Sequence, residues 1–275
     1  MKNVLGIFRA ACYSPGMVER DEAILRTVAR HLEGEGYEVS LIHEEELAFT
    51  TPLPDIVIHM ARSARALDIL QAWQEAGCRV INTVESVRAV ERTSLARLCA
   101  TRGIPTPKTW IVPTATPWHD EVALPCWIKR AGACAQEPDD VCRVTSRVEY
   151  EEAIARLHAR GIHEAVVMQH LEGPCIKFYA VKGTDFFHCL PAYDKWSDTI
   201  SPARREEHNA YAMTLCRSLL PLIEMANETP TIYGGDAIIA DDTAYLIDLN
   251  DWPSFSACRE DAAKAIVLLV EQQGR

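Results

Sequence analysis

The 275-residue sequence has no long hydrophobic run and no closely spaced cysteines, and each absence excludes a class of protein. The apolar run near its start, Val4–Phe8, is too short for a signal peptide, and no stretch reaches the roughly 20 residues of a membrane-spanning helix. The ten cysteines include no C-x-x-C pair, which argues against a zinc site or a disulfide framework. We therefore expect free thiols, no membrane partner and a cytoplasmic protein.

Basic residues are also few. The chain has 28 Lys and Arg against 39 Asp and Glu, a formal charge of −11. Nucleic acids are bound by a basic face, so this balance makes a nucleic-acid partner an unfavoured interpretation, although it allows a locally basic cleft. The sequence contains no internal repeat and no low-complexity segment. Its length predicts two or three subdomains in one compact body.

The first ninety residues alternate short apolar segments with amphipathic ones. This order predicts an α/β domain with a doubly wound parallel sheet over residues 1–90. Ligands of such sheets bind at the carboxyl ends of the strands, which makes the loops Arg9–Met17 and Ala61–Ser63 candidates for substrate contacts. The expected strands are Val4–Phe8, Tyr37–Ile42, Asp55–His59 and Arg79–Asn82, and the expected helices are Glu19–Leu32 and Ala64–Glu75.

A proline-containing break at Ile104–Pro107 follows a helix expected at about Val87–Thr101. Beyond the break, a β-β-α-β order indicates a small mixed subdomain over about residues 106–172, with a capping box that begins at Ser146. A second α+β subdomain is expected over about residues 173–275. Its predicted elements are the strands Ile176–Val181, Phe186–Leu190, Asp236–Ile239 and Ala244–Leu249, one helix from Pro202 through Leu222, and a closing helix over Arg259–Gln272.

The two strands predicted near the C-terminus carry a candidate metal site. Asp248 and Asn250 are two residues apart on one strand, so both side chains face the same side, and Asp236 on the paired strand can face it too. Two carboxylates and one amide oxygen suit Mg²⁺, with Mn²⁺ as an alternative ion. The competing interpretation is a strand end with a polar face.

The segment Gly-Gly-Asp-Ala-Ile-Ile, a short turn, and Leu-Ile-Asp-Leu-Asn-Asp-Trp-Pro-Ser-Phe resembles the C-terminal metal motif of ATP-grasp ligases. The pattern is most similar to RimK-like glutamate ligases, glutathione synthetases and D-alanine–D-alanine ligases. The resemblance implies a pre-ATP-grasp domain at 1–90 and an ATP-grasp domain at 91–275, whose lid (106–172) and catalytic subdomain (173–275) sandwich ATP. It places Asp236, Asp248 and Asn250 at the Mg²⁺ ligands. An aspartate replaces the usual glutamate, and Ser254 replaces a glycine found in many members.

The same resemblance assigns a nucleotide site upstream. Lys129 matches the strand lysine that reaches the nucleotide, and Lys177 matches a basic residue that contacts the triphosphate. Arg92 lies where many members have a phosphate-binding lysine, although a solvated helix arginine is an equal alternative. The adenine hinge is expected at Gln169, His170 and Leu171, with Glu172 as a ribose ligand.

The loop at residues 131–144 departs from the family pattern. Members usually have a glycine-rich flap here whose backbone N–H groups cover the phosphates, whereas this loop contains only Gly132. Its acids, Glu137, Asp139 and Asp140, are expected to repel phosphate. A flap that closes in a different way is the resulting expectation.

The resemblance implies an ATP-dependent ligase that forms a carbon–nitrogen bond, joining a small-molecule carboxylate to an amine or another nucleophile. The reaction passes through an acylphosphate and releases ADP and phosphate. Lys177 is the expected catalytic contact, and Arg259 could bind an acceptor carboxylate or simply be helix-start charge. The loops at 9–17, 61–63 and Cys189–Thr199 are expected to select the substrates, and a homodimer is compatible with the sequence.

Two alternatives come from other classes of protein. One is an ATP-grasp kinase of a small phosphorylated metabolite, which the acidic balance of the chain disfavours. The other is a non-catalytic nucleotide-binding module, suggested by the unusual flap and by Arg92. The intact set of three metal ligands argues against a pure binding module.

Overall fold

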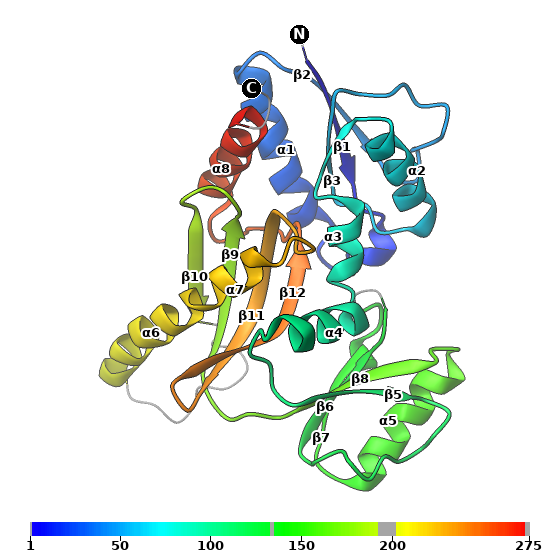
Figure 1. Cartoon of the computed structure of the whole chain (residues 1–275), viewed down its shortest axis with the longest axis vertical. Helices are drawn as coiled ribbons and strands as arrows, with labels where there is room; N and C mark the ends of the chain where they lie inside the picture. Colours follow the sequence, from blue (N-terminus) through cyan, green and yellow to red (C-terminus); the bar gives the residue numbers. More distant parts are fainter. Residues whose placement is uncertain (1, 133–134, 192–201, 273–275) are drawn as a thin grey trace.

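The computed structural model describes residues 2–132, 135–191 and 202–272, which form three four-stranded sheets (Figure 1). The mixed α/β architecture predicted from the sequence is confirmed. The cysteines in these ranges are free thiols, as expected. No helix within them is both long enough and apolar enough to cross a membrane.

The N-terminal sheet is parallel, with the strand order β2-β1-β3-β4. Five of the six residues of β1 and all four of β3 are buried, as expected for central strands of a parallel sheet. The helix α2 begins where the Ser63 hydroxyl accepts a hydrogen bond from the Ala66 N–H at 3.3 Å. The elements are β1 Asn3–Phe8, a 3-10 turn Ala11–Tyr13, α1 Val18–Gly34, β2 Glu38–His43, β3 Ile56–His59, α2 Ala64–Glu75 and β4 Arg79–Ile81.

The linker after β4 corrects one prediction. The single helix expected over Val87–Thr101 is two helices, α3 Val84–Ala89 and α4 Arg92–Arg102. The extended backbone of Glu91, with φ −58° and ψ 139°, separates them and makes Arg92 the first residue of α4. The buried side chains of α4 pack into the core of the C-terminal sheet.

The central sheet is antiparallel, with the order β5-β8-β6-β7, and is covered by α5. Its strand β7 corrects the expected β-β-α-β order, because this strand lies in the segment predicted to be a flap loop. The sheet and α5 have a hydrophobic core of their own, which includes Ile128, Tyr150 and Val167. The elements are β5 Thr109–Pro113, β6 Cys126–Arg130, a 3-10 turn Pro138–Asp140, β7 Val141–Val144, α5 Arg147–Ala159 and β8 Glu164–Gln169.

The C-terminal sheet is antiparallel, with the order β10-β9-β11-β12. The helix expected to run through Leu222 is split at Ser218 into α6 and α7, and the paired strands are longer than predicted. The elements are β9 Cys175–Val181, β10 Phe187–Pro191, α6 Pro202–Arg217, α7 Leu219–Met225, β11 Ile232–Ala240, β12 Thr243–Asp251 and α8 Arg259–Gln272.

The N-terminal and C-terminal sheets share one hydrophobic core through α1 and α8, which lie side by side (Figure 1). The buried Asn82, directly after β4, joins the two sheets. Its Nδ2 donates to the Ile232 carbonyl and its Oδ1 accepts from the Thr231 and Ile232 N–H groups, each at 2.8 Å. These contacts fix the carboxyl end of the parallel sheet against β11, whereas the central sheet folds around a separate core.

Candidate active site

One face of the C-terminal sheet changes from apolar to charged to polar along its strands. Side chains two residues apart on a strand point to the same face, so residues paired across the strands form rows about 7 Å apart. The charged row lies between an apolar row and a polar one. Taken in order, the three rows are Cys175–Ile238, Lys177–Asp236–Asp248 and Tyr179–Gly234–Asn250.

A β-bulge sets this register. From the turn onward, β11 pairs with β12 regularly, up to Ala237 opposite Leu246. The same register would next place Asp236 opposite Ile247, but the pairing shifts by one residue and Asp236 lies opposite Asp248. Bulges re-aim side chains in this way at functional sites. The buried residues of β12 are Ala244 and Leu246 before the bulge, and Leu249 and Asp251 after it. Asp248 and Asn250 therefore lie half-buried on the other face.

The two glycines before Asp236 are required by close packing. A Cβ atom on Gly235 would lie 2.6 Å from the Asp248 carbonyl oxygen and 2.6 Å from the Phe178 ring. A Cβ on Gly234 would lie 2.9 Å from the Phe178 carbonyl oxygen. Any larger residue would therefore push apart the strands that carry the charged row.

The first cavity, of about 420 Å³, lies between the central and C-terminal sheets. Its lining has two parts. The apolar part includes Trp127 and Met168 from the central sheet and Ile238 from β11. The charged part is formed by Arg92, Lys129, Lys177, Asp236 and Asp248.

The charges in this lining compensate one another. Lys177 Nζ lies 2.7 Å from Asp236 Oδ1. Burial lowers the pKa of Lys177, but the Asp236 carboxylate outweighs it and leaves the pKa above its usual value. Burial likewise raises the pKa of Asp248, but the charges of Lys129, Arg92 and Lys177 outweigh it and hold the pKa below its usual value. Asp248 is therefore ionised and Lys177 protonated at neutral pH.

Lys129 and Arg92 connect the parts of the molecule that face the cavity. Lys129 Nζ donates to the carbonyl of Ile247, the residue at the bulge, at 2.6 Å. Arg92 donates from its backbone N–H to Gly132 O at 3.4 Å and from Nη1 to Arg130 O at 3.3 Å. Both cations thus bridge segments that a ligand in the cavity would touch.

The expected hinge lies at the end of β8, and its residues face different ways. Gln169 and Leu171 line the first cavity. The buried His170 accepts from Trp127 Nε1 at 3.1 Å, and the Glu172 carboxylate lies 2.9 Å from His170 Nε2. The Glu172 side chain is 82% exposed and, with His170, is not among the residues that line this cavity. A direct ribose contact by Glu172 therefore stays a prediction.

The second cavity, of about 360 Å³, lies beyond the polar row. It shares Arg92 and Asp248 with the first cavity and also contains Asn250. Its remaining walls come from the loop after β1 and the start of α1, from Arg62 after β3, and from the end of β12 with the segment that follows it. The linker between α3 and α4 and the segment after β6 also contribute, through Val90, Glu91, Gly132 and Ala135. The loops expected to contact substrate thus meet the third predicted metal ligand.

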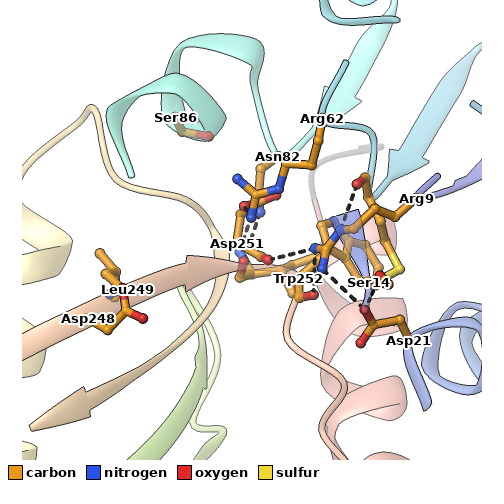
Figure 2. Close-up of polar contacts among 12 residues, drawn as sticks. Arg9, Ser14, Asp21, Arg62, Asn82, Ser86, Asp248, Leu249, Asp251 and Trp252 are labelled. Atoms are coloured by element: carbon orange, nitrogen blue, oxygen red, sulfur yellow. Dashed lines mark hydrogen bonds and ion pairs between the residues drawn. The ribbon is translucent and has the colours of Figure 1, made fainter. Parts of the chain in front are cut away.

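Paired charges lie in the lining of the second cavity, and Figure 2 shows their contacts. Arg9 Nη1 lies 3.2 Å from Asp21 Oδ2, and the same guanidinium donates to the backbone carbonyls of Asp251 and Trp252 at 3.5 and 3.4 Å. Arg62 forms an ion pair with the fully buried Asp251. Each buried arginine therefore has an acidic partner, so this part of the lining is close to neutral.

The buried Glu44, which follows β2, positions two of these loops. Its carboxylate accepts from the Ala10 N–H at 3.1 Å and from the Arg62 and Ser63 N–H groups at 2.6 and 3.4 Å. Neither Glu44 nor Asn82 was predicted from the sequence to have a role at the site. Their positions directly after parallel strands are the signal that could have identified them.

The acidic flap is an expectation that the structure corrects. Asp140 is fully buried and lies 2.6 Å from Arg160 and 3.5 Å from Arg130. Glu137 also pairs with Arg160, at 3.2 Å, and Asp139 lies 4.0 Å from Arg156. Burial alone would raise the pKa of Asp140, but Arg160, two backbone N–H groups and Arg130 lower it to about 2. These acids fold the segment against α5 and line neither cavity.

Two further expectations concern the acceptor. Arg259 is the first residue of α8 and is not among the residues lining the two cavities. Of the loop Cys189–Thr199, residues 189–191 belong to β10, and residues 192–199 lie outside the described residues.

The donor set fits a hard divalent cation. Asp236 and Asp248 face each other across two strands, and Asn250 follows on the same face. Among the residues described, no group of three or more His, Cys, Asp or Glu side chains could hold a metal ion by itself. Two carboxylates and an amide oxygen leave coordination positions for phosphate oxygens, which is how Mg²⁺ is usually held.

No protein-family model and no curated protein sequence matches the chain. Solved structures match along its whole length. The match to D-alanine–D-alanine ligase from Bacillus anthracis covers 100% of this chain and 100% of the ligase, with a TM-score of 0.69 and 11% identity. A RimK domain ATP-grasp protein from Sphaerobacter thermophilus covers 97% of this chain and 99% of its own, with a TM-score of 0.69 and 16% identity. D-alanyl-alanine synthetase A from Vibrio cholerae covers 98% and 100%, with a TM-score of 0.64 and 12% identity.

Proposed function

We propose that this chain, which has the ATP-grasp fold, is an ATP-dependent ligase that joins a small carboxylate to an amine through an acylphosphate. The observation that carries the proposal is the order of the three rows on the C-terminal sheet. An apolar row suits a nucleotide base, the charged row suits a triphosphate with its metal, and the polar row borders a separate cavity for the acceptor. A D-alanine–D-alanine ligase with this fold has been solved with ATP bound, which supports nucleotide use.

In the proposed arrangement, three cations neutralise the phosphates. Lys129 and Lys177 reach them from opposite sheets, and Arg92 lies in the wall common to both cavities. Asp236, Asp248 and Asn250 would hold Mg²⁺, which when bound neutralises charge on the transferring phosphoryl group. Lys177 would exchange its ion pair with Asp236 for a phosphate oxygen, and Asp236 would thereby become free to bind the cation.

The reaction then needs positioning more than covalent catalysis. A carboxylate oxygen of the substrate attacks the γ-phosphorus while the bond to ADP breaks, which gives an acylphosphate. The amine then attacks the acyl carbon, loses a proton and displaces phosphate. The central sheet, with its separate core, would close over the intermediate and exclude the water that would hydrolyse it.

The charges in the lining of the second cavity give less support to the alternative function, a kinase of a small phosphorylated metabolite. A phosphorylated acceptor requires an excess of cationic side chains. Of the three arginines in this lining, Arg9 and Arg62 are already paired with Asp21 and Asp251. The lining is charge-compensated, which suits a small neutral or zwitterionic acceptor.

The test measures the fate of the γ-phosphoryl group. The protein is incubated with Mg·ATP and a panel of amino acids and simple carboxylic acids, and ADP release identifies a substrate. For that acid, we expect hydroxylamine to trap a hydroxamate and oxygen-18 from the substrate carboxylate to appear in released phosphate. A stable phosphorylated product, with no label in phosphate, would replace the ligase with a kinase.

A further inference from the structure

Trp127 lines the first cavity, and a residue outside the cavity lining fixes the orientation of its indole ring. On β6 the side chains alternate, so that Cys126 and Ile128 enter the core of the central sheet while Trp127 and Lys129 line the cavity. Lys129 lies in the charged part of the lining, and Trp127 lies two residues away in the apolar part. The indole thus occupies the portion of the cavity that suits a nucleotide base.

A chain of two hydrogen bonds holds this indole. Trp127 Nε1 can only donate, and it donates to His170 Nδ1 at 3.1 Å. The Glu172 carboxylate can only accept, and it lies 2.9 Å from His170 Nε2. Both contacts are satisfied when the neutral His170 ring carries its proton on Nε2. The carboxylate therefore selects the tautomer of His170 that accepts from Trp127.

His170 is itself firmly placed. Its side chain is buried, and its backbone N–H donates to the Pro125 carbonyl at 3.1 Å, next to the start of β6. Its neighbours Gln169 and Leu171 line the cavity on which the indole borders. The hinge segment therefore touches the cavity through two residues and fixes the cavity wall through the third.

We propose that His170 is a positioning residue, which holds the indole of Trp127 as the surface on which the nucleotide base stacks. The inference rests on the proposed function, because it takes the first cavity to be the nucleotide site. An aromatic ring stacks well on a base only at a suitable offset, so fixing the ring before binding lowers the cost of the contact. Glu172 acts one step further away, by selecting the tautomer.

Substitutions at His170 separate this role from simple packing. In His170→Asn the amide oxygen can take the place of Nδ1 and still accept from Trp127, whereas His170→Gln places its amide near Nε2 and loses that acceptor. Binding of the Mg²⁺ complex of β,γ-imido-ATP, measured by titration calorimetry, gives the affinity of each variant. We expect Trp127→Leu to weaken binding on the order of tenfold. His170→Gln should weaken it about threefold to fivefold, and His170→Asn should restore nearly normal affinity.

A double-mutant cycle tests whether His170 acts through the indole. Trp127→Phe keeps an aromatic ring but has no N–H to donate, so His170→Gln should cost no further affinity in that background. Glu172→Ala should likewise weaken binding by the unsubstituted protein and cost no further affinity in the Trp127→Phe background, and because Glu172 is exposed this test does not depend on the folding of a buried variant. A loss that persists in the Trp127→Phe background would assign Glu172 to the predicted ribose contact and overturn its action through His170. Trp110→Leu on β5 and His163→Gln at the exposed end of the loop before β8 are matched controls, with unchanged affinity expected.

The results that would contradict the role of His170 differ from the result that would contradict the proposed function. Equal losses from His170→Gln in the presence and absence of the indole N–H, or no rescue by His170→Asn, would overturn the positioning role and leave the proposed function standing. Absence of nucleotide binding by the unsubstituted protein would instead overturn the proposed function and this inference with it.

Discussion

Replacing Asp248 by asparagine should reverse the effect of Mg²⁺ on nucleotide binding. The side chain keeps its shape and loses its charge, while Lys129, Arg92 and Lys177 remain around it. Two consequences oppose each other. The cation loses a carboxylate ligand, and the triphosphate gains a more positive surrounding. With Mg²⁺ the first effect dominates, and without Mg²⁺ only the second remains.

The magnitudes follow from mass action and Coulomb's law. With Mg·ATP at 100 times its Kd, binding stabilises the unsubstituted protein by about 2.7 kcal/mol, which raises Tm by roughly 5–11 °C. A hundredfold loss of affinity in Asp248→Asn would reduce this stabilisation to about 0.4 kcal/mol. In EDTA, removing a negative charge roughly 6 Å from a phosphate relieves about 0.7–3 kcal/mol of repulsion, so the variant should bind free ATP more tightly.

Thermal unfolding with ATP and Mg²⁺, and with ATP and EDTA, measures both effects in one assay. Asp242→Asn, an exposed turn residue on the same hairpin, is the matched control and should behave like the unsubstituted protein. Equal Tm increases for Asp248→Asn and the unsubstituted protein in Mg²⁺ would refute the metal site. Loss of the increase under both conditions would contradict the expected gain in EDTA, and the Tm without ligand shows whether the substitution damages the fold.

Two further predictions concern the framework of the site. Gly235→Ala should destabilise the protein by about 1–3 kcal/mol, because the added Cβ would lie 2.6 Å from backbone and ring atoms. Its control is Gly34→Ala at the end of α1, where the added Cβ meets open space, and this substitution should be neutral or stabilise the protein by up to about 1 kcal/mol. Urea unfolding compares the two, and equal effects would contradict the packing argument. Asp140, with its pKa lowered from 3.8 to about 2, should contribute roughly 2 kcal/mol of stability that is present above pH 4 and lost as the pH falls to 2. The stability difference between Asp140→Asn and the unsubstituted protein should therefore nearly vanish over that range, and a full difference that persists at pH 2 would assign it to packing.

Local spacing was enough to place part of the site. Asp248 and Asn250 are two residues apart on a strand, and the structure places both on one face with Asp236 opposite. The structure places Asp236 opposite Asp248 although the bulge at Ile247 could not be seen in the sequence, and the role of these residues as metal ligands stays a prediction. A regular hairpin from the same turn would have put Asp236 opposite Ile247, so the correct pairing depends on an irregularity that alternation rules do not contain.

Residues whose roles depend on distant partners were missed or misjudged. Asp140 was expected to repel phosphate because its charge was visible in the sequence and its partner Arg160, twenty residues away, was not. Asn82 joins β4 to a strand that begins 150 residues later, and no local pattern encodes such a contact. The breaks that divide α3 from α4 and α6 from α7 were similarly missed.

The wall common to the two cavities has a consequence for ligand design. Among the described residues, Arg92 and Asp248 alone line both spaces, so a molecule that joins a nucleotide-sized group to an acceptor-sized group needs a short bridge at that point and no long linker. Once either end is bound, a short linker holds the other at an effective concentration in the millimolar range. Such a linked ligand would therefore bind far more tightly than the sum of its separated halves at ordinary concentrations, and its optimal bridge length would report the width of this wall.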